Sequence, residues 1–128
     1  MTTPPVSLSS IGQIAINVHD LERATVFYRD TLDISQLFTA GGMAFLDCDG
    51  VRLMLGIAEK PEFDHPSPIL YFNVEDARTA YESLKEGVEF RSEPLVVHRT
   101  ETYELWMAFF HDTEGNTLAL MSEIVVQP

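Results

Sequence analysis

The chain contains a repeat of itself, and this repeat constrains the fold more than any other feature of the sequence. Residues 13–21 match residues 69–77 at an offset of 56 positions (69 − 13). The identities in this block are Asn17 with Asn73, Val18 with Val74, and Asp20 with Asp76. Residues 47–55 match residues 112–120 at an offset of 65 positions (112 − 47). Two matches in the same order predict a duplicated module. The nine additional residues of the second copy (65 − 56) are expected near residues 97–103.

The first block of each copy predicts a strand followed by a helix. Ile14, Ile16 and Val18 alternate with polar or small residues, which indicates a strand with one apolar face. Asp20 and its counterpart Asp76 then predict helix N-caps, because a short carboxylate can accept hydrogen bonds from the free backbone amides. Apolar residues at helical spacing follow each cap, as expected for a helix that packs on the strand.

The second block of each copy predicts a hairpin. Gly50 and Gly115 lie in turns flanked by apolar strands, and glycine adopts the positive φ that such turns require. The order in each half is therefore β-α-β-β-β. We expect a single α+β domain over residues 1–128, with module one at about 10–58, a connector rich in proline and charge at 59–67, and module two at about 68–123.

Charge excludes two classes of partner. The chain has 8 Lys and Arg against 20 Asp and Glu, a formal net charge of −12. Nucleic-acid binding needs clustered basic side chains that displace counterions, so we expect no nucleic-acid partner. Binding to an anionic membrane surface is disfavoured for the same reason. The acidity promotes solubility and would also suit a cationic ligand.

Cysteine content and hydropathy predict a cytoplasmic protein. Cys48 is the single cysteine, so no disulfide can form within the chain, as is usual in a reducing compartment. No apolar stretch approaches the length of a membrane span, and residues 1–5 show no signal-peptide pattern.

Three segments carry a resemblance to a known family: residues 18–32, 45–55 and 109–118. In this order, and duplicated, they resemble the vicinal-oxygen-chelate superfamily, which includes glyoxalases, bleomycin-resistance proteins and extradiol dioxygenases. The resemblance covers about residues 10–123. It implies sheets that curl around a cleft and a homodimer that covers the open sheet edges. Asp33 departs from the pattern, since most relatives carry glycine there, but aspartate tolerates tight backbone conformations.

The resemblance also locates the metal ligands of related enzymes, and this chain lacks them. The corresponding residues are Gln13, Met54, Ile69 and Ala119. Only Gln13 could coordinate a divalent cation, because these metals need several His, Asp or Glu groups. We therefore expect no metal at these positions and no cofactor, and the chain most resembles glyoxalase-like proteins that have lost their ligands.

The cleft predicted from strand alternation and the resemblance is lined by polar groups among apolar walls, which is typical of a small-molecule site. Residues 98–106 add a histidine and aromatic side chains beside a strand. The predicted ligand-binding residues are Gln13, Asn17, Arg52, Met54, Tyr71, His98, Trp106 and Thr117. An Arg52 that faces the cleft unpaired would favour an anionic ligand, whereas an Arg52 paired with acidic neighbours would favour a cationic one.

Two functional hypotheses follow. The first is a metal-independent protein that binds a small aromatic or amphipathic molecule, resembling the bleomycin-resistance branch. The second is a lyase or isomerase resembling glyoxalase I, or a dioxygenase, with a non-standard active site in which His98 or Tyr71 would be the catalytic candidates. The fold alone does not decide between them, because one scaffold hosts many activities. The missing ligand set favours the first hypothesis.

Overall fold

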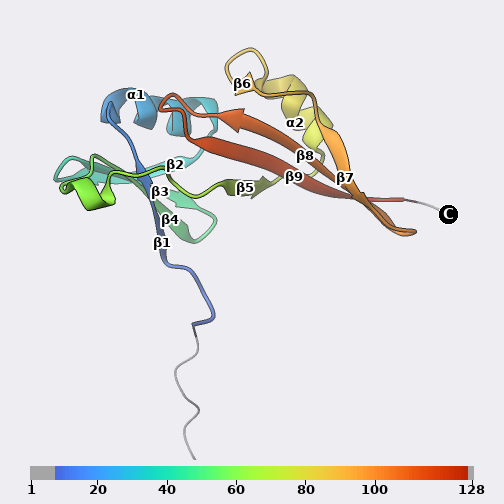
Figure 1. Ribbon diagram of the computed structural model, residues 1–128, viewed down its shortest axis with the longest axis horizontal. Helices are drawn as coiled ribbons and strands as arrows, with labels where there is room; N and C mark the ends of the chain where they lie inside the picture. The colour runs from blue at the N-terminus through green and yellow to red at the C-terminus, as the bar shows by residue number, and fades with distance from the viewer. Residues whose placement is uncertain (1–7, 127–128) are drawn as a thin grey trace, which may run out of the picture.

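The computed structural model describes residues 8–126, which form two β-sheets with one helix each (Figure 1). The first sheet has the strand order β1-β4-β3-β2. Its strands are β1 (Gln13–Asn17), β2 (Ser35–Ala40), β3 (Met43–Cys48) and β4 (Val51–Gly56). Helix α1 (Leu21–Val26) continues into a wider π-helical turn, η1 (Phe27–Thr31). This half has the predicted β-α-β-β-β order.

The second sheet has the strand order β5-β9-β8-β6, and β7 also pairs with β8. Its strands are β5 (Leu70–Asn73), β6 (Glu89–Phe90), β7 (Leu95–Arg99), β8 (Tyr103–His111) and β9 (Thr117–Val125), and its helix is α2 (Ala77–Leu84). Both β6 and β7 pair with β8, so together they occupy the place that β2 fills in one piece. Figure 1 shows the β7–β8 hairpin extending past α2, near where the sequence predicted the insertion.

The strand register confirms the α+β fold with two equivalent halves. Strands β1 and β4 pair in parallel with Ala15 opposite Met54. Strands β5 and β9 pair in parallel with Tyr71 opposite Ala119, which are the residues 56 and 65 positions further on. The same offsets that align the sequence therefore align the backbone pairing.

Both helices begin at the predicted caps. The Asp20 carboxylate accepts a hydrogen bond from the Arg23 backbone amide at 3.1 Å, and Asp76 accepts one from the Arg78 amide at 2.9 Å. Asp33, at the position where the family resemblance leads us to expect glycine, has a φ of 57°, a left-handed backbone conformation that glycine favours. Neither helix within residues 8–126 has the length and apolar character needed to cross a membrane.

Each sheet has a helix-covered face and an open face, and Figure 1 shows α1 and α2 on the same side of the two sheets. The helix-covered faces form the core. Its largest fully buried side chains are those of Tyr28, Phe110, Ile16, Leu46, Leu53, Leu55, Leu118 and Val18. Alternation along β1 and β4 leaves Gln13, Ala15, Arg52 and Met54 on the open face, as predicted.

The turn between β8 and β9 joins the two halves. Its Asp112 carboxylate accepts hydrogen bonds from the backbone amides of Glu114 and Asn116, both at 2.8 Å. The Glu114 carboxylate in turn accepts one from the Asp20 amide at 2.8 Å, at the start of α1. The Arg23 guanidinium donates to the Thr113 carbonyl at 2.7 Å. Polar contacts from the second half therefore hold the first helix in place.

Candidate functional site

A pocket lies on the open face of the first sheet. Its volume is about 460 Å³, which is within the range of small-molecule sites. Strand β1 and the end of β4 line it, together with the β2–β3 turn and the connector between the two sheets. The lining residues are Ala15, Ile16, Asn17, Gly41, Gly42, Met43, Met54, Gly56, Ile57, Ala58, Glu59, Phe63 and His65.

Two residues of the pocket lining are smaller than their counterparts in the second half. Ala15 corresponds to Tyr71, and Gly56 corresponds to Met121 by the register of each sheet. A Cβ atom at Gly56 would lie 3.1 Å from Cγ of Met43, which is closer than ordinary van der Waals contact. The place beside Gly56 is therefore already taken by the Met43 side chain, and a larger residue at position 56 would displace Met43 within the pocket.

Two methionines contribute soft apolar surface to the pocket. Met54 and Met43 lie on neighbouring strands, and the Gln13 side-chain amide donates to Sδ of Met54 at 3.7 Å. Thioether side chains are flexible and polarisable and contact aromatic rings favourably. This part of the pocket suits a flat apolar group.

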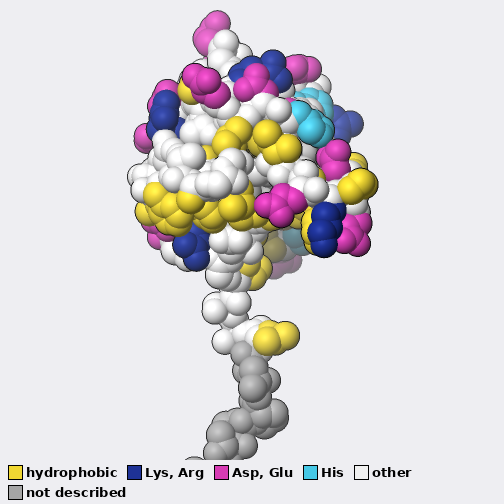
Figure 2. Space-filling model, turned by 90° about the vertical axis from the view of Figure 1, so that its left-hand side faces the viewer, with side chains coloured by type: hydrophobic (Ala, Val, Ile, Leu, Met, Phe, Trp, Pro, Cys, Tyr) yellow, Lys and Arg dark blue, Asp and Glu magenta, His cyan; other side chains and the backbone are white. Residues whose placement is uncertain are grey.

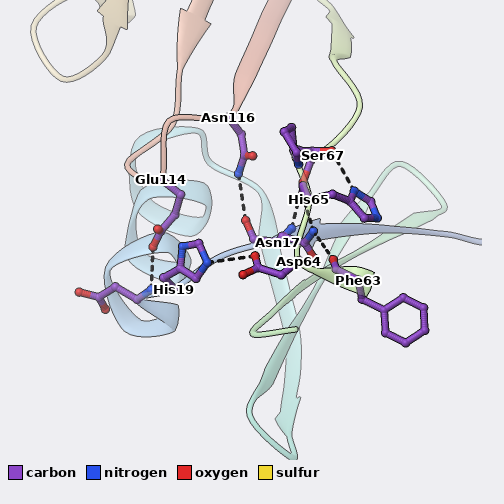
Figure 3. Close-up of polar contacts among 10 residues, drawn as sticks. Asn17, His19, Phe63, Asp64, His65, Ser67, Glu114 and Asn116 are labelled. Carbon is purple, nitrogen blue, oxygen red and sulfur yellow. Dashed lines mark hydrogen bonds and ion pairs between the residues drawn. The ribbon is translucent and has the colours of Figure 1, made fainter. Parts of the chain in front are cut away.

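The connector forms the other wall, and Asn17 holds it (Figure 3). The Asn17 side-chain amide donates to the backbone carbonyls of Phe63 and His65, both at 2.6 Å. The Asn17 backbone amide donates to Oγ of Ser67 at 3.0 Å. Nearby, Nε2 of His19 lies 3.1 Å from the Asp64 carboxylate. Figure 3 shows Phe63, His65 and Ser67 of the connector meeting at Asn17, and the His19 ring reaching Asp64.

Few charges line the pocket. Glu59 is the one carboxylate in the lining, which includes no Lys or Arg from the described part of the chain, residues 8–126. Arg52 lies outside the pocket on the same face, with its guanidinium 5.6 Å from the ring centre of Phe45. Phe45 in turn stacks on Phe38 with ring centres 4.5 Å apart. Arg52 forms no ion pair with another residue of 8–126.

Apolar side chains are exposed around the pocket, at the end of the molecule formed by the first sheet and the connector. Figure 2 shows a band of hydrophobic side chains across this end, with acidic side chains around it. Large apolar side chains of the first half and the connector that are about half exposed are Leu37, Phe38, Ile57 and Phe63. Such surface beside a pocket is typical of an interaction site.

The residues at the family's metal positions do not fit a metal. The Gln13 amide contacts the Met54 thioether. Ile69, the residue before β5, is 46% exposed, and the Ala119 methyl group is fully buried. Between residues 8 and 126, no group of three or more His, Cys, Asp or Glu side chains is arranged to hold an ion. A thioether, an alkyl group and a methyl group cannot supply the ligands that a divalent catalytic metal needs.

Tyr71 lies away from the pocket, beside a groove of about 400 Å³ where β5 meets β1 and β4. Its ring makes an edge contact with Phe109, with ring centres 5.8 Å apart. Cys48 lines the same groove, and burial raises the pKa of its thiol, with further increases from the nearby Asp47 and Asp49 carboxylates. A raised pKa opposes formation of the thiolate, so Cys48 is a poor nucleophile.

The remaining predicted residues belong to the second sheet. By register, Thr117 and His98 lie on its open face, and the His98 ring is 6.1 Å from that of Tyr103. Trp106 lies on the opposite, helix-covered face, so a single chain does not place it with Tyr71. It alternates with buried Ala108 and Phe110 along β8 and is covered by Arg78, whose guanidinium is 4.5 Å from the ring centre.

Of the predicted ligand-binding residues, Asn17 and Met54 line the pocket and Gln13 contacts Met54. Sequence reasoning missed Met43 and the connector residues Phe63 and His65. Met43 follows the glycine pair 41–42 at the β2–β3 turn, and no sequence pattern marked it as a pocket residue. The connector has no periodic pattern, and no local signal showed which side of the sheet it would cover.

Comparison with known proteins agrees with this architecture. The model of the Glyoxalase/Bleomycin resistance protein/Dioxygenase superfamily matches residues 10–120. The chain belongs to this superfamily. A glyoxylase-like domain-containing protein from Didymella fabae is 31% identical over 125 residues, covering 86% of this chain and 91% of the relative.

Solved structures of the superfamily share the fold. A glyoxalase/bleomycin resistance protein/dioxygenase from Nocardioides superposes with a TM-score of 0.76 at 22% identity, covering 94% of this chain and 87% of that one. TnmS3, an antibiotic binding protein from Streptomyces sp. CB03234, superposes with a TM-score of 0.73 at 21% identity, covering 92% and 98%. The resemblance inferred from the sequence is therefore confirmed.

Proposed function

We propose that this superfamily member is a metal-independent binding protein for a small aromatic or amphipathic molecule. The observation that carries the proposal is the pocket of about 460 Å³ on the first sheet, whose lining includes the small residues Ala15 and Gly56. The poor fit of the family's metal positions supports binding over metal-dependent catalysis. The antibiotic-binding description of TnmS3 is further support, since that protein has the same fold.

The lining indicates the chemistry of the ligand. Methionine and phenylalanine side chains offer area to a flat apolar body. The carboxylate of Glu59 favours a cationic or neutral polar group at the rim, and Arg52 lies outside the lining above Phe45. An anionic group would bring its charge near Glu59 without a lining Lys or Arg within residues 8–126 to offset it.

The same proposal includes a homodimer. The open face of the second sheet carries large apolar side chains that residues 8–126 leave about half exposed: Ile69 is 46% exposed, Tyr71 44% and Leu95 60%. Burial of such area is favourable by about 25 cal/mol per Å². A second copy that covers this face would bring Tyr71, His98 and Thr117 toward a ligand, so these predicted residues stay part of the proposal.

We also propose a cytoplasmic location. Cys48 is the only cysteine of the chain, which fits a compartment where disulfides are rare. The raised pKa of its thiol slows oxidation through the thiolate, so the residue would stay reduced there.

A thermal-shift screen tests the proposed function. The panel contains cationic, neutral and anionic aromatic compounds and the ions Zn²⁺, Ni²⁺, Mn²⁺ and Fe²⁺. We expect cationic or neutral aromatics to raise the melting temperature, because a ligand that binds only the folded state stabilises it. A rise with a metal ion alone would reject the proposal and favour the alternative, a glyoxalase-like lyase or isomerase or a dioxygenase.

A further inference from the structure

The connector covers one side of the pocket as a strap, defined here as Phe63, Asp64 and His65. Two strap residues line the pocket, and Phe63 is 53% exposed. The strap begins at the last residue of the short helical turn η2 (Pro61–Phe63). There the backbone amides of Phe63 and Asp64 donate hydrogen bonds to the carbonyls of Lys60 and Pro61. These internal bonds shape the strap but do not attach it to the sheet.

Attachment of the strap to the sheet depends mainly on Asn17. One side-chain amide donates to two strap carbonyls at 2.6 Å. The other side-chain tie, between His19 and Asp64, joins groups that are 69% and 50% exposed, and such exposed pairs contribute little. Beyond the strap, Oγ of Ser67 accepts a hydrogen bond from the Asn17 backbone amide at 3.0 Å, which a change of the Asn17 side chain leaves in place. The Asn17 side chain is therefore the contact that fixes where residues 63–65 lie over the pocket.

The repeat provides an internal comparison. Asn73 occupies the position equivalent to Asn17, but its side chain makes no hydrogen bond with another of residues 8–126. The asparagine is thus not required by the strand itself. In the first half the Asn17 amide holds a segment that, among residues 8–126, has no counterpart over the second sheet.

We propose that the strap is the specificity-determining wall of the pocket and that Asn17 is its positioning residue. The ligand class is a planar aromatic molecule that contacts the Phe63 ring together with the thioethers of Met43 and Met54. This inference rests on the proposed function. Asn17 acts through the strap, because both donor hydrogens of its amide are engaged by the carbonyls of Phe63 and His65.

Fluorescence titration with the neutral aromatic dye N-phenyl-1-naphthylamine tests the inference. In Asn17→Asp, a carboxylate replaces the donor amide and faces two carbonyl oxygens. We expect affinity for the dye to fall about tenfold or more, the loss associated with two hydrogen bonds of ordinary strength. The matched control is Asn73→Asp, which makes the same chemical change at the equivalent position and should bind within about twofold of the unmodified protein.

A double-mutant cycle separates positioning from a general loss of structure. Phe63→Ala alone should weaken dye binding, and the double variant with Asn17→Asp should lose little more than Asn17→Asp alone, because both changes remove the same wall. Additive losses would show that Asn17 does not act through Phe63 and would overturn the inference.

Hydrogen exchange on the unmodified protein covers the case in which Asn17→Asp fails to fold. Bound dye should slow exchange at residues 63–67 more than at residues 95–99 of the β7 strand, and equal protection would overturn the inference. If the unmodified protein binds the dye and Asn17→Asp binds it equally, the strap inference fails while the proposed function stands. If no panel compound and no dye binds the unmodified protein, both fail.

Discussion

The hydroxyl of Tyr28 donates a hydrogen bond of 2.7 Å to the carboxylate of Asp112, and both side chains are buried. Tyr28 belongs to the helical turn η1 of the first half, and Asp112 to the β8–β9 turn of the second. The Asn116 side-chain amide donates both to Asp112 at 2.9 Å and to the Asn17 carbonyl at 3.1 Å. This network therefore connects the junction of the two halves with the residue that positions the strap.

Removal of the Tyr28 hydroxyl should destabilise the protein. Tyr28→Phe leaves Asp112 buried with one hydrogen bond fewer, and we expect the free energy of unfolding to fall by about 1–3 kcal/mol. Urea denaturation measures the change. Tyr81→Phe is the control, because the Tyr81 hydroxyl makes no hydrogen bond with residues 8–126 and its ring contacts Phe90. An effect no larger than that of the control would contradict the prediction.

Stability should fall at alkaline pH, and Tyr28 should account for part of the fall. Burial raises the pKa of the Tyr28 hydroxyl far above its ordinary value near 10, and the charges and hydrogen bond of Asp112 and Glu114 add to the increase. Above about pH 10 the unfolded chain loses this proton while the folded chain keeps it, so stability decreases as pH rises. The contribution is fully present below that pH.

Urea denaturation at pH 9 and pH 11 checks this dependence. The unmodified protein should lose about 1 kcal/mol more than Tyr28→Phe between these two pH values, since one pKa unit corresponds to about 1.4 kcal/mol. Subtraction of the variant removes the contributions of the other tyrosines and the lysines. Parallel pH profiles for the two proteins would show that Tyr28 titrates normally.

A larger side chain at position 56 should weaken ligand binding without unfolding the protein. Gly56→Met introduces the residue found at the equivalent position 121, and its Cβ meets only the flexible Met43 side chain at 3.1 Å. We expect dye affinity to drop about tenfold or more, because the side chain occupies the pocket. Gly12→Met is the matched control, since a Cβ at Gly12 has no heavy atom within 4 Å. Unchanged dye binding in Gly56→Met would place the ligand elsewhere.

The proposed homodimer predicts twice the mass of one chain by light scattering at micromolar concentration. Tyr71→Asp puts a charge on the exposed open face of the second sheet and should shift the mass toward that of a monomer, because an unpaired charge is costly to bury. Val26→Asp changes another exposed apolar residue, 43% exposed at the end of α1, and should leave the mass unchanged. A monomer mass for the unmodified protein would reject the dimer.

Helix starts and strand faces were predictable because they depend on neighbouring residues. Asp20 and Asp76 cap their helices through amides two or three residues away. Alternation places Gln13, Arg52 and Met54 on one face whatever lies above them, since successive side chains of a strand point to opposite sides. The left-handed backbone at Asp33 and Gly50 follows from the same local chemistry.

The environment of Trp106 could not be predicted from neighbouring residues alone. Residues 98–106 were interpreted as a ligand-binding stretch from composition, although alternation with Ala108 and Phe110 would have placed the indole on the apolar, helix-covered face. Its packing under the Arg78 guanidinium depends on where α2 lies over β8, and this is a long-range contact.

The sequence by itself determined the duplication, the order of elements and the absence of a usual metal-ligand set, because each depends on residue identity at fixed spacing. Only the tertiary structure decided that the pocket forms on the first sheet, where Ala15 and Gly56 belong to the lining and Asn17 holds the strap above it. A pocket is the volume that packing leaves unfilled, so it depends on segments far apart in the chain. Asn17 and Asn73 are both asparagines at equivalent positions of the two sheets. Their roles differ because, of these two side chains, only that of Asn17 contacts the connector within residues 8–126.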